Sequence, residues 1–139
     1  MSHAKNKRYE AIKRMSNRMN ERNDCTVKAL AMTGRVTYKV AHGVCADYGR
    51  PERRGMYLSQ QVKTVFNSIG FDAIKIHRQA QKNGSKFTPK TVGSVCKAGY
   101  YLAFTRSHVL PVINGEVYDW TDGRKHHITS IWKITRKRA

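Results

Sequence analysis

The order of the predicted elements places this chain of 139 residues in the α+β class, as a single domain. Two observations lead to this prediction. Apolar residues recur at helical spacing through most of the first half of the chain, and alternating apolar and polar residues dominate after Gly99. Within the second region, Asn114-Gly115 predicts a tight hairpin, because this dipeptide favours the turn that joins neighbouring antiparallel strands.

Four helices are predicted in the first half, because apolar side chains share one face of each segment and breaking residues separate the segments. They are expected at residues 4–21, 24–33, 37–48 and 58–69. Asn23 or Asp24 is placed to cap the second helix, and Ser59 to cap the fourth. Gly34 stands where the second helix could end in the left-handed conformation. The second helix is short and mostly apolar, so we expect it to be buried.

The second half predicts a strand at 71–77, a short helix at 89–97 that starts at Thr88-Pro89, and then an antiparallel meander. The strands of the meander are expected at 99–106, 107–114, 116–120 and 128–135. Helices therefore come first and antiparallel strands last, which is typical of the α+β class. We expect the buried second helix to pack against a strongly curved sheet.

Positive charge is the strongest feature of the composition. Lys and Arg number 27 against 9 Asp and Glu, a formal net charge of +18. Such a field attracts nucleic acid, an acidic protein or an acidic surface, although a solvated basic surface has the same composition. Arg50 belongs to the central one of three basic clusters. The candidate polyanion-binding residues are Lys5, Lys7, Arg8, Arg14, Arg18, Arg53, Arg54, Arg136, Lys137 and Arg138.

The positions of these clusters divide the chain into a basic N-terminal helix or arm (1–22), a folded domain (23–135) and a basic tail (136–139). The N-terminus lacks the apolar segment of a secretory signal, and no apolar run approaches the length of a membrane span. Three cysteines cannot all pair within one chain, which favours a reducing compartment, the cytoplasm. His126 and His127 are adjacent and would point to opposite faces, so we expect no metal and no cofactor.

Cys25 is the cysteine placed for nucleophilic chemistry, because it lies at the predicted start of the second helix, where a thiolate is stabilised. Cys45 lies in an apolar stripe and Cys96 near the end of the 89–97 helix, so both are interpreted as packing residues. A thiolate also needs a base and a group that orients the base. His108 and Asp119 lie on strands joined by the predicted hairpin, and this pairing brings them together.

Two segments, RNDCTVKALA (22–31) and GYYLAFTRSHVLPVINGEVYDW (99–120), resemble the papain-like cysteine peptidase superfamily. The resemblance is closest to small bacterial and phage proteins with Asn-Asp-Cys at the catalytic helix, and more distant to bacteriocin-processing peptidases. It covers roughly residues 20–120, in the same order of elements. The resemblance implies a papain-like fold with Cys25 as nucleophile, His108 as general acid/base and Asp119 as the residue that orients His108. Trp120 could shield the pair from water.

The sequence departs from that family at the oxyanion site. Active members usually have a Gln about six residues before the Cys, where this chain has Met19, and Thr26 stands in place of the usual Gly. Asn23 is therefore the expected side-chain donor. We expect a cysteine hydrolase, most simply a peptidase with a peptide or protein substrate, although a transamidase or deamidase would use the same triad. The alternative is a catalytically weak or inactive papain-like fold that serves as a basic binding module for nucleic acid or an acidic host or virion protein. Such a protein would be phage-encoded and act in the host cytoplasm or the virion.

Overall fold

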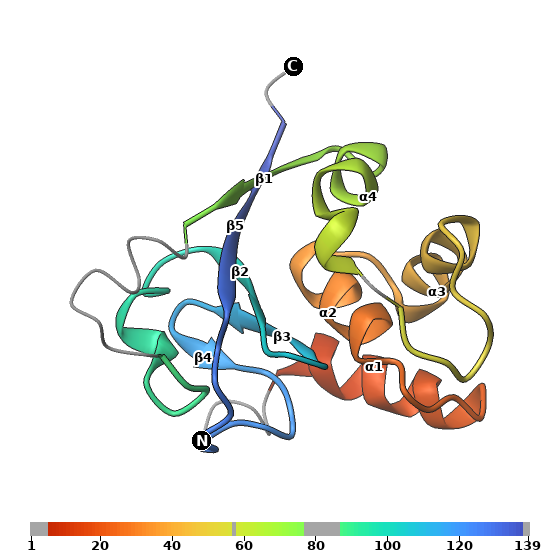
Figure 1. Ribbon diagram of the computed structural model, residues 1–139. Coiled ribbons are helices and arrows are strands. Elements are labelled where there is room, and N and C mark those ends of the chain that lie inside the picture. Colours follow the sequence, from red (N-terminus) through yellow and green to blue (C-terminus); the bar gives the residue numbers. More distant parts are fainter. Residues whose placement is uncertain (1–5, 57, 77–86, 138–139) are drawn as a thin grey trace.

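The chain is an α+β protein, seen here in a computed structural model that describes residues 6–56, 58–76 and 87–137. Four α-helices lie together on one side of a five-stranded antiparallel sheet in the described part (Figure 1). The helices are α1 (Lys7–Arg18), α2 (Cys25–Thr33), α3 (Tyr38–Asp47) and α4 (Val62–Ser68), with short 3-10 turns η2 (Leu58–Gln60) and η3 (Val92–Ser94). The strands are β1 (Phe71–Lys75), β2 (Tyr100–Phe104), β3 (Val109–Ile113), β4 (Glu116–Val117) and β5 (Ser130–Arg136).

The sheet has the strand order β1-β5-β2-β3-β4, with antiparallel pairing throughout. The predicted meander is therefore correct for β2, β3 and β4 and wrong for β5, which returns to lie between β1 and β2. The register pairs Leu102 of β2 with Trp132 of β5 on one edge and with Pro111 of β3 on the other. This central position buries both faces of β2, which explains why its sequence, YYLAF, has no polar side.

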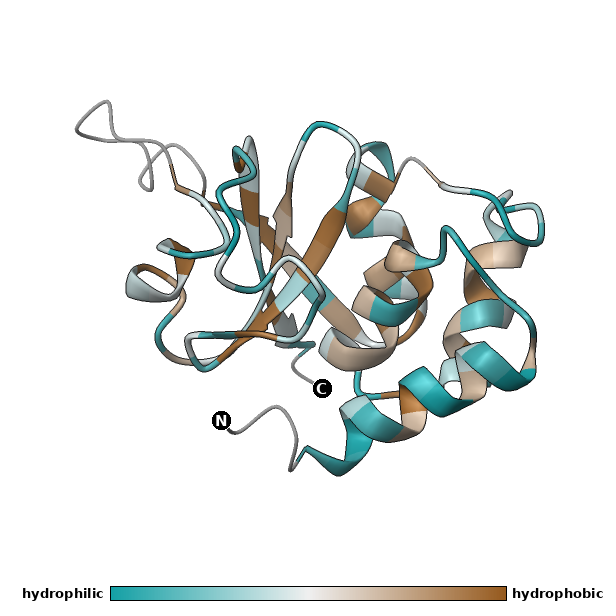
Figure 2. Cartoon of the chain, turned by 90° about the horizontal axis from the view of Figure 1, so that it is seen from below, coloured by the Kyte–Doolittle hydropathy of each residue, from teal (hydrophilic) through white to brown (hydrophobic). Residues whose placement is uncertain are grey.

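The sheet has a hydrophobic cluster on each face. Leu102 and Phe104 of β2 pack with the helices, and α2 is the most deeply buried helix, with seven of its nine residues buried. Tyr101 and Ala103, which alternate with them, pack with Val92 and Cys96 of the segment that covers the opposite face. In Figure 2 the strands at the centre are largely brown, the colour of hydrophobic residues, and the helices carry both teal and brown residues.

Three local predictions are wrong. Residues 89–97 form turns and η3, not a helix, because Gly93 approaches the backbone of Gly115 so closely that a Cβ would lie 2.4 Å from the Gly115 carbonyl oxygen. Gly34 ends α2 in a right-handed conformation (φ −84°). Its lack of a Cβ instead leaves room for Ile69, because a Cβ on Gly34 would lie 2.8 Å from the Ile69 Cδ1. Ser59 lies in η2, so α4 begins at Val62, two residues later than a cap at Ser59 would place it.

Both ends of the described chain are part of the fold. Asn6 caps α1 by accepting a hydrogen bond from the Tyr9 N–H, and α1 buries Ile12 against the other helices. At the other end, Arg136 belongs to β5, and the Lys137 N–H donates to the carbonyl of Gly70. None of the helices in the described residues has the length and apolar character needed to cross a lipid bilayer.

Candidate active site

Cys25 is the first residue of α2, and its side chain is half-buried where α2 packs against β3. Asp24 occupies the position before the helix, but it does not cap it. The Asp24 carboxylate instead accepts hydrogen bonds from Ser16 Oγ and Tyr38 Oη, each 2.6 Å long. These bonds fix the start of α2 against α1 and α3. They also hold the Cys25 thiol beside the N–H groups of the first helical turn, which stabilise negative charge.

His108 and Asp119 meet across the predicted hairpin. Asn114 and Gly115 both have positive φ angles, as the tight turn requires, and this confirms the hairpin. His108 directly precedes β3, Asp119 follows β4, and His108 Nε2 lies 2.7 Å from Asp119 Oδ2. The Thr121 hydroxyl donates to the same oxygen at 2.7 Å. Because Nε2 is held by Asp119, Nδ1 is the ring nitrogen left for Cys25.

The thiol and the imidazole stabilise each other's charged forms. Burial alone would raise the pKa of Cys25, but hydrogen bonds from the His108 side chain and the Val109 backbone N–H, together with the charge of His108, lower it below the usual value. Burial would lower the pKa of His108, but the hydrogen bonds to Asp119 and Cys25 outweigh it and raise the pKa to about 9. Near neutral pH this arrangement favours a thiolate beside an imidazolium.

The other two cysteines have the opposite electrostatics. Cys45 and Cys96 are fully buried among apolar side chains, and burial raises the pKa of each thiol to about 12. Neither is part of a disulfide. Their thiols stay protonated near neutral pH, so Cys25 is the cysteine with nucleophilic character.

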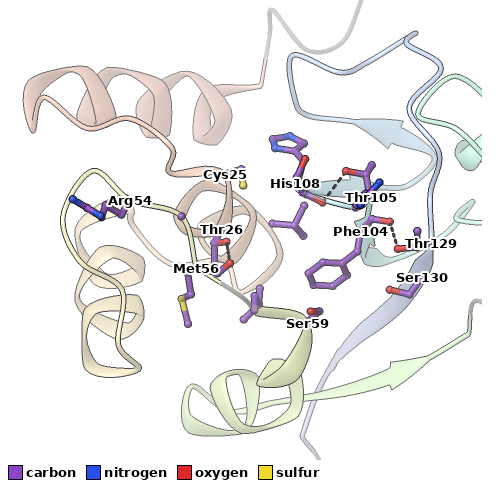
Figure 3. Close-up of a pocket in the computed structure, with 15 residues that line it drawn as sticks. Cys25, Thr26, Arg54, Met56, Ser59, Phe104, Thr105, His108, Thr129 and Ser130 are labelled. Atoms are coloured by element: carbon purple, nitrogen blue, oxygen red, sulfur yellow. Dashed lines mark hydrogen bonds between the residues drawn. The ribbon is translucent and has the colours of Figure 1, made fainter.

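A cavity of about 590 Å³ opens beside Cys25 and His108. Figure 3 shows the two residues on opposite walls, Cys25 from α2 and His108 from the segment before β3. The walls combine apolar side chains, such as Met56 and Phe104, with several hydroxyl groups, among them Ser59. A cavity of this size, partly apolar and with a few polar groups beside a perturbed thiol, is suited to a substrate side chain.

A second cavity, of about 530 Å³, meets the first one at the same pair. Both cavities include Cys25, His108, Gly55 and Ser107 in their walls, so the reactive pair lies between them. A polypeptide placed across Cys25 would have one arm in each cavity.

Asn23, the expected oxyanion donor, is held away from that role. It lines the second cavity, but its side-chain N–H donates to the Arg53 carbonyl at 3.2 Å, and its backbone is left-handed (φ 52°). The prediction of Asn23 as donor is therefore wrong for this conformation. The backbone N–H of Cys25, in the first turn of α2, has no acceptor within the helix and is the donor that remains at the nucleophile.

Trp120 packs beside the reactive pair but does not enclose it. Its ring centroid lies 5.2 Å from that of His108, and the His126 ring packs edge-on against it, with the centroids 5.5 Å apart. Trp120 is nevertheless 61% exposed. It therefore covers one side of the imidazole and leaves the thiol open to both cavities.

The candidate polyanion-binding residues lie in three separate places. Those in the described part are all exposed: Lys7, Arg8, Arg14 and Arg18 on α1, Arg53 and Arg54 in the loop before η2, and Arg136 and Lys137 at the end of β5. Lys5 and Arg138 lie outside the described residues. Arg50, which the sequence groups with Arg53 and Arg54, is buried, so its interpretation as part of a basic surface is wrong.

Arg50 belongs to a buried ion pair that sequence analysis missed. Its guanidinium donates two hydrogen bonds to Glu21, at 2.9 and 3.3 Å, while His42 Nε2 lies 2.6 Å from the same carboxylate. The Arg53 backbone N–H also donates to Glu21. These bonds, led by those from Arg50, outweigh burial and lower the pKa of Glu21 to about 2. The pair ties the loop after α3 to the segment that leads into Cys25.

Comparison with known proteins adds no relative. No family model matches this chain, and no curated protein sequence and no solved structure matches it either. Within the described residues, no three His, Cys, Asp or Glu side chains group to hold a metal ion.

Proposed function

We propose that this protein is a cysteine hydrolase of papain-like architecture, most simply a peptidase. The observation that carries the proposal is that Cys25, at the start of α2, and His108 line the same two cavities, and that His108 Nε2 lies 2.7 Å from Asp119. Nucleophile, base and orienting carboxylate come from three separate parts of the chain, in the order found in papain-like enzymes. The two cavities that meet at Cys25 support a polypeptide substrate.

The mechanism follows from these contacts. The Cys25 thiolate attacks the carbonyl carbon of the scissile amide, and the Cys25 backbone N–H donates to the oxyanion that forms. The His108 imidazolium gives its proton to the leaving nitrogen, the carbon–nitrogen bond breaks, and a thioester remains on Cys25. His108 then takes a proton from water, whose oxygen displaces the sulfur and releases a carboxylic acid. Asp119 keeps the imidazole oriented and stabilises its charged form.

Alkylation with iodoacetamide tests this proposal. Near neutral pH we expect Cys25 to react at least about 10²-fold faster than Cys45 or Cys96, because a buried thiol of high pKa is almost entirely protonated and a thiolate is the reacting species. His108→Ala should reduce the alkylation rate of Cys25 about tenfold or more, because it removes the imidazole whose hydrogen bond and charge lower the pKa of the thiol. Mass spectrometry of the three cysteine peptides measures all rates in one sample. Equal, slow labelling of the three thiols would rule out the hydrolase.

Polyanion binding is the second candidate function. Arg14 and Arg18 are exposed on α1, and within the described residues neither pairs with a carboxylate. Such residues contact phosphates, or carboxylates of an acidic protein, without reading a base sequence. Filter binding of DNA and RNA at rising salt tests it, since displacement of counterions predicts a steep, log-linear loss of affinity. Affinity that is absent at low salt, or that does not change when Arg14 and Arg18 are replaced by Gln, would refute this candidate.

A further inference from the structure

The charged side chains that line the two cavities beside Cys25 include paired carboxylates and unpaired arginines. Three carboxylates line the second cavity, those of Glu21, Asp24 and Asp119. Each is neutralised or hydrogen-bonded from within the protein. Glu21 binds Arg50 and His42, Asp24 binds Ser16, Tyr38 and Lys28, and Asp119 binds His108 and Thr121. The first cavity has no Asp or Glu among its lining residues.

Three arginines on the walls of the same two cavities have no such partner. Arg54 and Arg106 line the first cavity and Arg22 lines the second. All three side chains are exposed, and in the described part of the chain none pairs with a carboxylate. Figure 3 shows the Arg54 side chain extending from the rim and not toward Cys25, so its charge acts at the mouth of the cavity. The unpaired charges around the nucleophile are therefore all positive.

The remaining groups of the first cavity suit an acidic side chain. Phe104 and Met56 offer apolar surface to a short hydrocarbon stem. Ser59, Ser107 and Ser130 line the same space and carry hydroxyl groups that can donate to a carboxylate. An arginine at the rim adds long-range attraction, because its guanidinium remains charged at any working pH.

We propose that this site selects anionic polypeptides, with Asp or Glu close to the scissile bond, through the charge of Arg22, Arg54 and Arg106. The inference deepens the proposed function and rests on it, because it concerns the substrate of the same thiol. The positive charge would attract an acidic segment to the cavities before the segment contacts Cys25. This attraction would raise the rate of productive encounter more than the rate of the chemical steps.

Two alkylating reagents of similar size, one charged and one neutral, test the charge around Cys25. Iodoacetate is an anion and iodoacetamide is neutral, and both place the same carbon on the sulfur as iodide leaves. The measured quantity is the ratio of their rates at Cys25, divided by the same ratio for glutathione. A change in the thiolate fraction affects both reagents alike and cancels in the ratio, so the ratio reports the field around the sulfur.

The variant to compare with wild type carries Arg22→Gln, Arg54→Gln and Arg106→Gln. Its matched control carries Lys39→Gln, Lys63→Gln and Lys97→Gln, which removes the same charge from exposed residues outside both cavities. At low salt we expect the arginine variant to lower the ratio about three- to tenfold, and the lysine control to change it less than about twofold. The difference should shrink in high salt, because salt screens charges at this distance.

The outcomes separate this inference from the proposed function. An unchanged ratio in the arginine variant, or an equal fall in the lysine control, overturns the selection of anions at the site, even if Cys25 reacts fast. Pools of peptides with Glu, and matched pools with Gln, supply the second measurement: we expect a higher kcat/KM for the Glu pools in wild type and a smaller preference in the arginine variant. If neither pool is cleaved while the alkylation ratio falls as expected, peptidase activity is refuted and the anion-selective site stands.

Discussion

The buried pair of Glu21 and Arg50 gives the sharpest stability prediction. Glu21 is 3% exposed and the Arg50 side chain 1%, and two hydrogen bonds join them. Glu21→Gln keeps the shape of the side chain but leaves the Arg50 guanidinium buried without its counterion. A buried charge that loses its partner destabilises a protein strongly, by about 3–5 kcal/mol.

The lowered pKa of Glu21 expresses the same interaction as an order-of-magnitude free energy. It is lowered from the ordinary value of 4.5 to about 2, with the hydrogen bonds from Arg50 as the largest lowering cause. A difference of that size corresponds to about 3 kcal/mol in favour of the ionised folded state. Because the folded pKa is the lower one, this stabilisation is fully present above about pH 4.5 and is lost as the pH falls toward about 2.

Urea denaturation, followed by tryptophan fluorescence, measures the effect. We expect Glu21→Gln to reduce the free energy of unfolding by about 3 kcal/mol near pH 7, and by much less near pH 2.5. Glu52→Gln is the matched control, because Glu52 is 72% exposed and lies 4.0 Å from Arg53; it should cost less than about 0.5 kcal/mol. A loss below about 1 kcal/mol near pH 7, or an equal loss at both pH values, would refute the reasoning.

Two other predictions concern the proposed triad and the close contact between Gly93 and Gly115. Asp119→Asn removes the strongest influence that raises the pKa of His108, so the imidazolium that lowers the pKa of Cys25 is weakened. The rise of the Cys25 alkylation rate with pH should move to higher pH, and the rate near pH 7 should fall about tenfold; an unchanged pH–rate profile contradicts this. Gly93→Ala should reduce stability by about 1–3 kcal/mol, because its Cβ would lie 2.4 Å from the Gly115 carbonyl oxygen. Gly43 lies in α3, and a Cβ there would have nothing within 4 Å. Gly43→Ala should instead raise the free energy of unfolding by about 0.5–1 kcal/mol, which a higher melting temperature would show.

The sequence predicts those parts of the fold that depend on local patterns. The four helices begin and end within a few residues of their expected positions, because an apolar stripe and a breaking residue act within one segment. The position of β5 between β1 and β2 depends on partners about sixty and thirty residues away in sequence, which alternation does not encode. The 89–97 helix fails for a similar reason, because the contact of Gly93 with Gly115 outweighs the local preference at Thr88-Pro89.

The site shows the same division. Cys25 and the contact of His108 with Asp119 were predictable, because a helix start and a two-residue hairpin fix them locally. Asn23 was not, since its amide binds Arg53, thirty residues along the chain. Glu21 and Arg50 are likewise 29 residues apart. In a chain with 27 Lys and Arg, nothing in the sequence distinguishes the one buried arginine among the described residues from its exposed neighbours.

Glu21 also connects stability with the selectivity proposed for the site. It holds the Arg53 backbone N–H, and so positions the loop that carries Arg54 to the rim of the cavity beside Cys25. Electrostatics alone predicts that removing the negative charge of Glu21 raises the preference of Cys25 for iodoacetate over iodoacetamide. A loosened loop predicts the opposite, because Arg54 leaves the rim. A lower ratio of the iodoacetate rate to the iodoacetamide rate in Glu21→Gln would therefore show that the ion pair positions Arg54. The loss of the negative charge of Glu21 cannot by itself lower this ratio.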